Sequence, residues 1–371
     1  MASSKRLWSL SFLPLALIEE IFHRTPAESL IRSKPTCKQW YDLITNNKRF
    51  LNEHLHRYPE RSLRTDERRF LRIDETVQIM DPVRQTRSET QIPYELQTRY
   101  YIKAMVHCHG LMLCMCSDME SRSPTSLFGI HSRGISNGSV PRSVSRLLIT
   151  TGLVTTEVEI YHCKTSSWRT LDDAKVDWSV DSTCQGVAVM GNMYWLARRG
   201  IVQDQNHLEY YVLGYDFSVE TFKDVCFCPP AYYDNNYLSC FNGDKLSLLQ
   251  QDQEEKTSPI EVWVSSKLDD GNVLFTRYFT VASPNLPALL FDREKASHPV
   301  YYIAKNKRII ALCEGAVDEE GDRFPVCITL YEIDEGGVSS RLVTEEHYED
   351  HYAGTFLCGY LYVPSLVPLL V

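Results

Sequence analysis

The first fifty residues of the chain carry an apolar pattern with the spacing of α-helices. Between positions 13 and 22 the apolar residues form two adjacent rows with a spacing of four, as on one face of an amphipathic helix. They are Leu13, Leu17, Ile18, Ile21 and Phe22. Pro14 suits the first turn, where a backbone N–H has no intrahelical partner to lose. We therefore predict a helix that begins near Leu13 and has one broad apolar face.

Two further helices are expected before residue 50. Pro26 fits the first position of the second helix, and Thr25 with Glu28 has the spacing of a capping box. Pro35 should end this short helix, because proline cannot donate a helical hydrogen bond. A third helix is predicted from the apolar stripe Cys37, Trp40, Tyr41, Leu43 and Ile44, with Phe50 just beyond it.

Three short helices over residues 13–50 offer little volume for a core of their own. Domains below roughly 40 residues are rarely stable alone, so part of the apolar surface must be covered by something else. Either the helices are a cap packed on the chain's own larger domain, or they leave an apolar face for another protein. The helical period alone does not distinguish the two interpretations.

From about residue 68 the helical period gives way to short β-like runs separated by turn residues. We expect a first strand at 70–73, and a strand pair or one strand with a glycine bulge at 106–116. Hairpins are predicted in three segments that share a Gly or Asn turn, 186–197, 238–249 and 303–312. Asn242-Gly243 is the strongest of these turn signals.

Strands of a second kind alternate with these hairpins. They are predicted at 158–161 with 167–169, at 213–217 with 221–223 and at 260–264 with 274–277. The hairpin turns at Gly191, Gly243 and Asn306 are 52 and 63 residues apart, a loose repeat near the roughly 40–50 residues of propeller blades. Four strands per repeat would explain the pattern, so we predict an all-β, β-propeller-like domain, with an irregular β-sandwich as the alternative.

One stretch of this β region departs from the pattern. Residues 118–146 are rich in Ser, Arg and Gly, and such a composition buries too little apolar surface to order a strand pair. We therefore expect a disordered insertion, or a blade that lacks its middle part, within 118–146.

Composition and charge limit the classes of partner. The chain has 371 residues, of which 43% are apolar and 23% charged, enough for one small and one large globular domain. Its net charge is −9, divided into +5 for residues 1–70 and −14 for the remainder. A nucleic-acid binder would normally carry a basic stripe on its large domain, so nucleic acid is not the expected partner.

The cysteines and the N-terminus indicate a cellular compartment. The 12 cysteines are scattered along a long chain, which fits free thiols in a reducing compartment better than a disulfide scaffold. Lys5-Arg6 and the apolar run after it lack a small-residue cleavage site, and no run reaches the ~18 apolar residues that span a bilayer. We expect a soluble intracellular protein, cytoplasmic and/or nuclear, without a membrane partner.

Residues suited to catalysis or metal binding are sparse. His107, His109, Cys114 and Cys116 lack the spacing of a zinc knuckle and are better explained as strand residues. No Gly-rich phosphate loop, Gly-x-Ser-x-Gly elbow or His-Glu-x-x-His motif occurs in the sequence. We predict no catalytic residue, no metal and no cofactor, and therefore no enzyme.

The helical segment resembles an F-box of the plant type. The motif reads Leu-Pro-x-x-Leu-x-x-Glu-Ile-Phe, then Ser-Leu-x-Arg, then Cys-Lys-Gln-Trp-x-x-Leu-Ile. The residues that carry it are Leu13, Pro14, Leu17, Glu20, Ile21, Phe22, Pro26, Ser29, Leu30, Arg32, Cys37, Lys38, Trp40, Leu43, Ile44 and Phe50. This resemblance implies docking onto a Skp-type adaptor, and through it onto a cullin and a RING protein.

The β region resembles the type-one F-box-associated interaction domain of plant F-box proteins. Its matching motifs include Tyr161 to Ser167-Trp168-Arg169, Gly186-Val187 to Gly191-Asn192-Met193-Tyr194, Ile260-Glu261-Val262-Trp263-Val264 and the tail from Gly359 to Val367. Pro364 and the apolar residues around it indicate a last strand that seals the domain. The whole chain is then α+β, with a three-helix F-box at 8–51, a linker at 52–68 and a β-propeller-like domain at 69–371.

The two resemblances together imply the substrate receptor of a Skp–cullin–F-box ubiquitin ligase, which holds an unknown target protein. The residues expected to face the adaptor or to pack the F-box are Leu13, Pro14, Leu17, Ile21, Phe22, Leu30, Cys37, Trp40, Leu43 and Ile44. The alternative is a propeller that binds a small ligand or glycan, or acts as an enzyme, with the helices as a cap and no ligase role.

Overall fold

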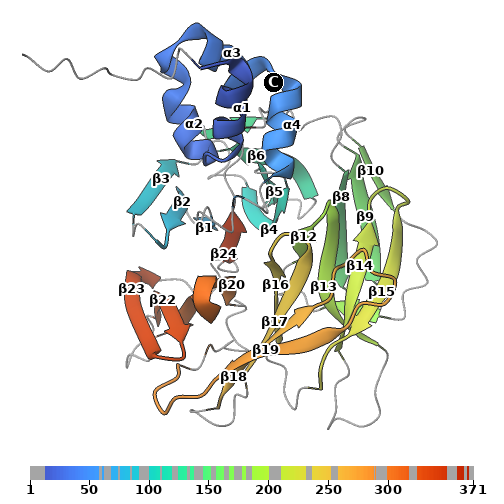
Figure 1. Cartoon of the computed structure of the whole chain (residues 1–371). Helices are drawn as coiled ribbons and strands as arrows, with labels where there is room; N and C mark the ends of the chain where they lie inside the picture. The colour runs from blue at the N-terminus through green and yellow to red at the C-terminus, as the bar shows by residue number, and fades with distance from the viewer. Residues whose placement is uncertain are drawn as a thin grey trace, which may run out of the picture.

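The computed structural model places a helical unit at the start of the chain and antiparallel sheets after it (Figure 1). The residues that it describes are 13–57, 61, 68–73, 76–83, 86–91, 100–108, 111–118, 124–131, 134–137, 145–151, 156–162, 167–170, 178–180, 186–199, 210–230, 236–251, 258–287, 289, 299–316, 324–348, 357–362 and 366.

The helical unit contains one helix more than the sequence pattern indicates. The helices are α1 Leu15–His23, α2 Ala27–Ser33, α3 Lys38–Asn46 and α4 Lys48–His56, with the 3₁₀ turn η2 Lys34–Thr36 between α2 and α3. Pro35 lies in η2 and ends α2, as predicted. Residues 52–56 were expected in a linker, but they belong to α4, where the buried Leu51 and His54 face the other helices.

The predicted helix starts need a correction. Pro14 and Pro26 lie at the N-cap positions of α1 and α2, not inside the first turns. The expected capping box is not formed, because the Thr25 hydroxyl donates to the carbonyl of Ile21 at 2.8 Å, one turn back. Glu28 is engaged elsewhere, with the guanidinium of Arg69.

The helical unit has its own apolar core. The cluster contains Ile18, Phe22, Ala27, Leu30, Trp40, Leu43, Ile44, Phe50, Leu51 and Leu366. Every member but one comes from α1 to α4; the exception, Leu366, lies close to the other end of the sequence. Phe22 packs with its ring edge-on to Trp40 and also contacts Phe50. This arrangement turns the apolar stripe of α3 toward α1 and not toward solvent.

The described strands form six antiparallel sheets. They are β24-β1-β2-β3, β4-β5-β6-β7, β10-β9-β8, β11-β13-β14-β15 with β12 paired to β13, β16-β17-β18-β19 and β20-β21-β22-β23. The strands are β1 Arg69–Ile73, β2 Thr76–Asp81, β3 Thr86–Gln91, β4 Tyr100–Cys108, β5 Leu111–Asp118, β6 Pro124–His131, β7 Gly134–Asn137, β8 Ser145–Thr151, β9 Thr156–His162, β10 Ser167–Thr170, β11 Trp178–Val180, β12 Val187–Val189, β13 Asn192–Arg199, β14 Tyr210–Asp216, β15 Thr221–Phe227, β16 Asn236–Phe241, β17 Lys245–Gln251, β18 Ile260–Ser265, β19 Phe275–Val281, β20 Val300–Ala304, β21 Arg308–Ala316, β22 Phe324–Asp334, β23 Gly337–Tyr348 and β24 Leu357–Tyr362.

Five of these sheets are arranged as the blades of a propeller. Strand contacts run from β24 to β4, β12, β16 and β20 and back to β24, so five inner strands close a ring around the centre of the domain (Figure 1). The sixth sheet, β10-β9-β8, contacts the blade of β12 and β13 through β8 and β11. The α+β class and the propeller-like architecture predicted from the sequence are confirmed, and the sandwich alternative is not.

The predicted hairpin turns carry the backbone conformation that their residues favour. Met190 and Gly191 have positive φ angles of 51° and 81°, and Asn242 and Gly243 have 53° and 85°. Two successive positive φ values define the type I′ turn, whose twist matches that of paired strands. The first turn joins β12 to β13 and the second joins β16 to β17.

The last strand closes the ring. β24 pairs antiparallel with β1, with Arg69 opposite Tyr362 and Phe70 opposite Leu361. One sheet is therefore built from both ends of the β region, as the apolar tail of the sequence predicted. Because β24 pairs with β1, the backbone N–H and C=O groups along that side of β1 are not left as an unpaired sheet edge.

The disordered insertion expected at 118–146 is contradicted over part of its length. β6, β7 and the start of β8 fall inside this range, and β6 pairs with β5 so that Phe128 lies opposite Cys114. The composition argument overlooked the run Leu127-Phe128-Gly129-Ile130, which has the apolar character of a strand. Residues 119–123, 132–133 and 138–144 lie outside the described part of the chain.

Candidate functional site

Two apolar side chains lie on the solvent face of α1. Leu17 and Ile21 are 51% and 40% exposed, and they are one turn apart. Ile18 and Phe22 form the adjacent row and are buried in the core of the helical unit. The apolar surface of α1 is therefore wider than the part that this core covers. We call Leu17 and Ile21 the α1 apolar face; Leu15 is also exposed, but it lies two positions before Leu17 and so on a different side of the helix.

Ion pairs hold α1 in place beside this face. Glu20 accepts from Arg24 at 2.7 Å and from Arg57, which follows α4, also at 2.7 Å. These hydrogen bonds lower the pKa of the Glu20 carboxyl, and the one from Arg57 has the larger effect. Glu20 thus links α1 to the residue that follows α4.

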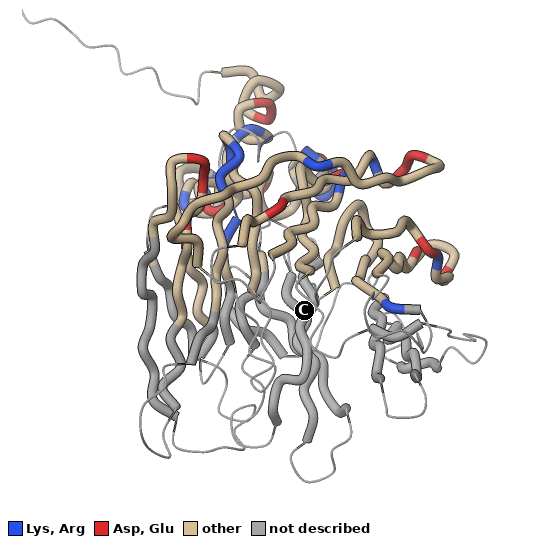
Figure 2. Tube along the Cα trace, turned by 90° about the horizontal axis from the view of Figure 1, so that it is seen from below, with Lys and Arg blue, Asp and Glu red and all other residues tan. Residues whose placement is uncertain are grey.

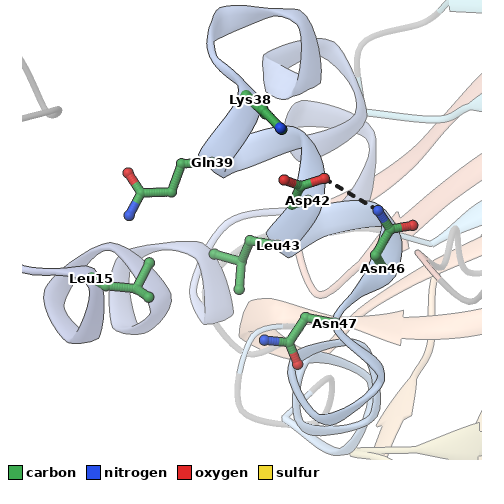
Figure 3. Close-up of a pocket in the computed structure, with 7 residues that line it drawn as sticks. All are labelled: Leu15, Lys38, Gln39, Asp42, Leu43, Asn46 and Asn47. Carbon is green, nitrogen blue, oxygen red and sulfur yellow. Dashed lines mark hydrogen bonds between the residues drawn. The ribbon is translucent and has the colours of Figure 1, made fainter.

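A shallow groove of about 650 Å³ lies between the start of α1 and the exposed side of α3 (Figure 3). Its lining residues are Leu15, Lys38, Gln39, Asp42, Leu43, Asn46 and Asn47. Leu15 and Leu43 supply its apolar surface, and Asn46 donates to the carboxylate of Asp42 at 3.2 Å. Leu15 and Leu17 are two positions apart and therefore point to different sides of α1, so the groove is separate from the surface that carries Leu17 and Ile21.

The ten residues singled out from the sequence divide into three groups. Pro14, Leu17 and Ile21 are exposed. Leu13 and Cys37 are half-buried beside the core, whereas Phe22, Leu30, Trp40, Leu43 and Ile44 are buried in it. The sequence pattern did not separate these groups, and the ten residues did not include Leu15 or Tyr41, which are both exposed. The signal for Leu15 was its place beside the apolar rows of the first helix.

The described part of the chain offers little for catalysis or metal binding. Among its residues, no group of three or more His, Cys, Asp or Glu side chains is placed to hold a metal ion. Burial raises the pKa of the thiols of Cys226 and Cys313 to about 12, so both stay protonated and poorly nucleophilic. The side chains of His107, His109, Cys114 and Cys116 lie outside the described residues.

Charge is mixed along the described trace. Figure 2 shows basic and acidic residues interspersed, without a continuous stripe of either sign in the part that is drawn in colour. In the same part of the chain, no helix has the length and apolar character needed to cross a bilayer. Neither observation favours a nucleic-acid site or a membrane site over a protein-docking surface.

Comparison with known proteins gives matches at both ends of the chain. Residues 10–52 match the F-box domain family, and residues 146–369 match the F-box associated beta propeller domain family. The chain is 41% identical over 403 residues to the Putative F-box only protein 15 of Arabidopsis thaliana, with 100% of each chain covered. It is 36% identical over 388 residues to the F-box/WD-40 repeat-containing protein 1 of the same plant, covering 97% of this chain and 89% of the relative.

Proposed function

Because the chain belongs to the family of F-box proteins that carry an F-box associated beta propeller domain, we propose that it is the substrate receptor of a Skp–cullin–F-box ubiquitin ligase. In this role the helical unit docks a Skp-type adaptor, which connects it to a cullin and a RING protein. The propeller holds a target protein, so that ubiquitin transfer follows from proximity.

The α1 apolar face is the observation that carries this proposal. Leu17 and Ile21 keep about half of their surface in water, and covering an apolar side chain of this size completely is worth roughly 1.5–3 kcal/mol. A partner that covers both side chains therefore gains about 1–3 kcal/mol from these two residues alone.

The proposal assigns residues 8–51 to adaptor docking, with α4 as a further helix of that unit, and residues 69–371 to target binding. The chain takes no catalytic part, because ubiquitin is transferred by the other subunits. It acts in the cytoplasm and/or the nucleus, where the adaptor and the cullin are found. The proposal leaves the target undefined, since propeller specificity lies in loops.

The competing proposal is a propeller that binds a small ligand or a glycan, with the helices as a mere cap. A cap would bury its apolar residues against the large domain. Trp40 and Ile18 are indeed buried, but within the helical unit itself, whereas Leu17 and Ile21 remain exposed. An exposed apolar face favours the receptor proposal, because a cap has no use for one.

Affinity purification of the full chain tests the receptor proposal. The wild-type chain should recover a Skp-type adaptor together with a cullin, and the double substitution Leu17→Asp/Ile21→Asp should abolish this recovery. Val219→Asp, at an exposed apolar residue of the propeller, is the matched control and should recover the adaptor normally. Equal recovery by the double variant and the wild type would reject the proposal.

A further inference from the structure

The core of the helical unit contains a residue from the far end of the chain. Leu366 is 3% exposed and belongs to the same apolar cluster as Ile18, Phe22 and Leu30. It lies four positions after Tyr362, the last residue of β24. Leu366, which follows the ring-closing strand in the sequence, therefore supplies part of the core on which α1 rests.

A buried ion pair makes a second connection at the same place. The side chain of Arg69, in β1, is 5% exposed, and its Nη2 atom lies 3.1 Å from a carboxylate oxygen of Glu28 in α2 and 3.1 Å from one of Asp81 in β2. A buried guanidinium is tolerated only where carboxylates compensate its charge. Arg69 thus holds α2 against the first blade of the propeller.

Both connections start from one pair of strands. Arg69, the first residue of β1, lies opposite Tyr362, the last residue of β24. The ion pair of Arg69 therefore starts at the end of the strand pair that leads to Leu366 in the sequence. Arg68 fixes this end to the neighbouring blade, because its Nη1 donates to the carbonyl of Ile303 at 3.0 Å and its guanidinium lies 4.1 Å above the Tyr302 ring.

We propose that Arg69 and Leu366 form a two-point joint that fixes the orientation of the helical unit on the propeller, and that Leu366 is an integral part of the core of the docking unit. Two attachments at separate points, one ionic on α2 and one apolar in the core, prevent the rotation that either alone would allow. Arg69 and Leu366 are positioning residues, and neither belongs to the α1 apolar face. Only the consequence for ubiquitin transfer, a constant distance from target to ligase, rests on the proposed function.

Hydrogen exchange of the isolated full chain tests the apolar point of the joint. Leu366→Ala should accelerate amide exchange in α1 to α4 by about tenfold or more, because a cavity in a small core raises the frequency of its opening. The sheet β16-β17-β18-β19 should exchange at the wild-type rate. Leu289→Ala is the matched control, since Leu289 is 2% exposed in the core between β16–β19 and β20–β23; it should affect those sheets and spare the helices.

Spin-label distances test the ionic point. Labels introduced as non-canonical amino acids at Asn52 in α4 and at Lys267 in the propeller, both exposed, should give one narrow distance distribution in the wild type. Glu28→Gln should broaden it at least twofold. Glu332→Gln should not, although Glu332 is also paired with an arginine at 3.1 Å and is 32% exposed, against 30% for Glu28.

The proposal requires both results. Unchanged exchange in the helices of Leu366→Ala, or an unchanged distribution in Glu28→Gln, would overturn it. If Leu366→Ala does not fold, the volume-conserving Leu366→Met should restore folding together with wild-type exchange in the helices, and failure to do so would also overturn the joint. Neither experiment needs an adaptor, so its outcome is independent of whether adaptor docking itself is observed.

Discussion

The rings of Phe22 and Trp40 meet edge to face, with centroids 4.9 Å apart and planes at 85°. This contact joins α1 to α3 and lies inside the helical unit, where Trp40 is almost completely buried. Trp40, one of the ten residues expected to face the adaptor or to pack the F-box, therefore packs the core. In the proposed function the docking surface is the outer face of α1, which carries Leu17 and Ile21.

Replacement of Trp40 should destabilise the helical unit and not merely weaken docking. Trp40→Ala removes a large side chain from a packed core and is expected to cost about 3–5 kcal/mol in the free energy of unfolding. Denaturant unfolding followed by helical circular dichroism measures this loss. Tyr41→Ala, at the neighbouring exposed position, should cost about 1 kcal/mol or less. Equal costs for the two variants would contradict the placement of Trp40 in the core.

A glycine turn in the propeller gives a prediction that depends on backbone conformation alone. Gly191 has a φ of +81°, and a Cβ atom added to it would meet no atom within 4 Å. Gly191→Ala should therefore destabilise the chain by about 1 kcal/mol through strain in the left-handed conformation. Gly271→Ala is the control, because Gly271 is equally open but lacks a positive φ. Thermal unfolding of both variants checks this, and an equal loss in Gly271→Ala would contradict it.

The stability of the helical unit should depend on pH through His54. Its Nε2–H donates to the carbonyl of Thr25 at 2.9 Å, and burial, followed by the charge of Arg61, lowers its pKa to about 3. The folded state therefore keeps His54 neutral at a pH where the unfolded chain takes up a proton. This contribution to stability is complete above about pH 6.5 and is lost as the pH falls toward 3, by roughly 1.4 kcal/mol per pH unit.

Unfolding measurements between pH 7.5 and pH 5 test this dependence while most carboxylates remain ionised. The free energy of unfolding of the wild type should fall over this range. It should fall less steeply in His54→Gln, because the unfolded variant takes up about one proton fewer than the unfolded wild type. His23 remains in the variant and has a pKa that burial also lowers, so some slope should persist. Identical slopes in the two proteins would show that His54 takes up its proton at the same pH in the folded and the unfolded chain, and would contradict a lowered pKa.

Features that depend on neighbouring residues were predictable from the sequence. The apolar rows of α1 and α3 and the turns at Gly191 and Asn242-Gly243 were predicted, because helical period and turn conformation are set within a few residues. The run of strands and the closing tail likewise indicated a propeller. The family resemblance then related these elements to a possible function.

Features that depend on distant parts of the chain were not predictable. Thr25 and Glu28 had the spacing of a capping box, but the box does not form. The carboxylate of Glu28 instead pairs with the guanidinium of Arg69, which is buried and needs a negative charge beside it. Nothing near Leu366 in the sequence indicates that it packs with Phe22, since this contact forms only after the propeller closes. For the same reason the sequence did not show which apolar residues of the first helix remain exposed.

Calorimetric titration of the purified full chain with a Skp-type adaptor tests the central claim most directly. The account predicts that Ile21→Asp weakens binding by about 100-fold or more, because a charge would be buried in an apolar contact, while the free energy of unfolding stays within about 1 kcal/mol of the wild type. Val219→Asp should bind as the wild type does. Wild-type affinity in the Ile21→Asp variant would contradict the claim that the outer face of α1 is the docking surface.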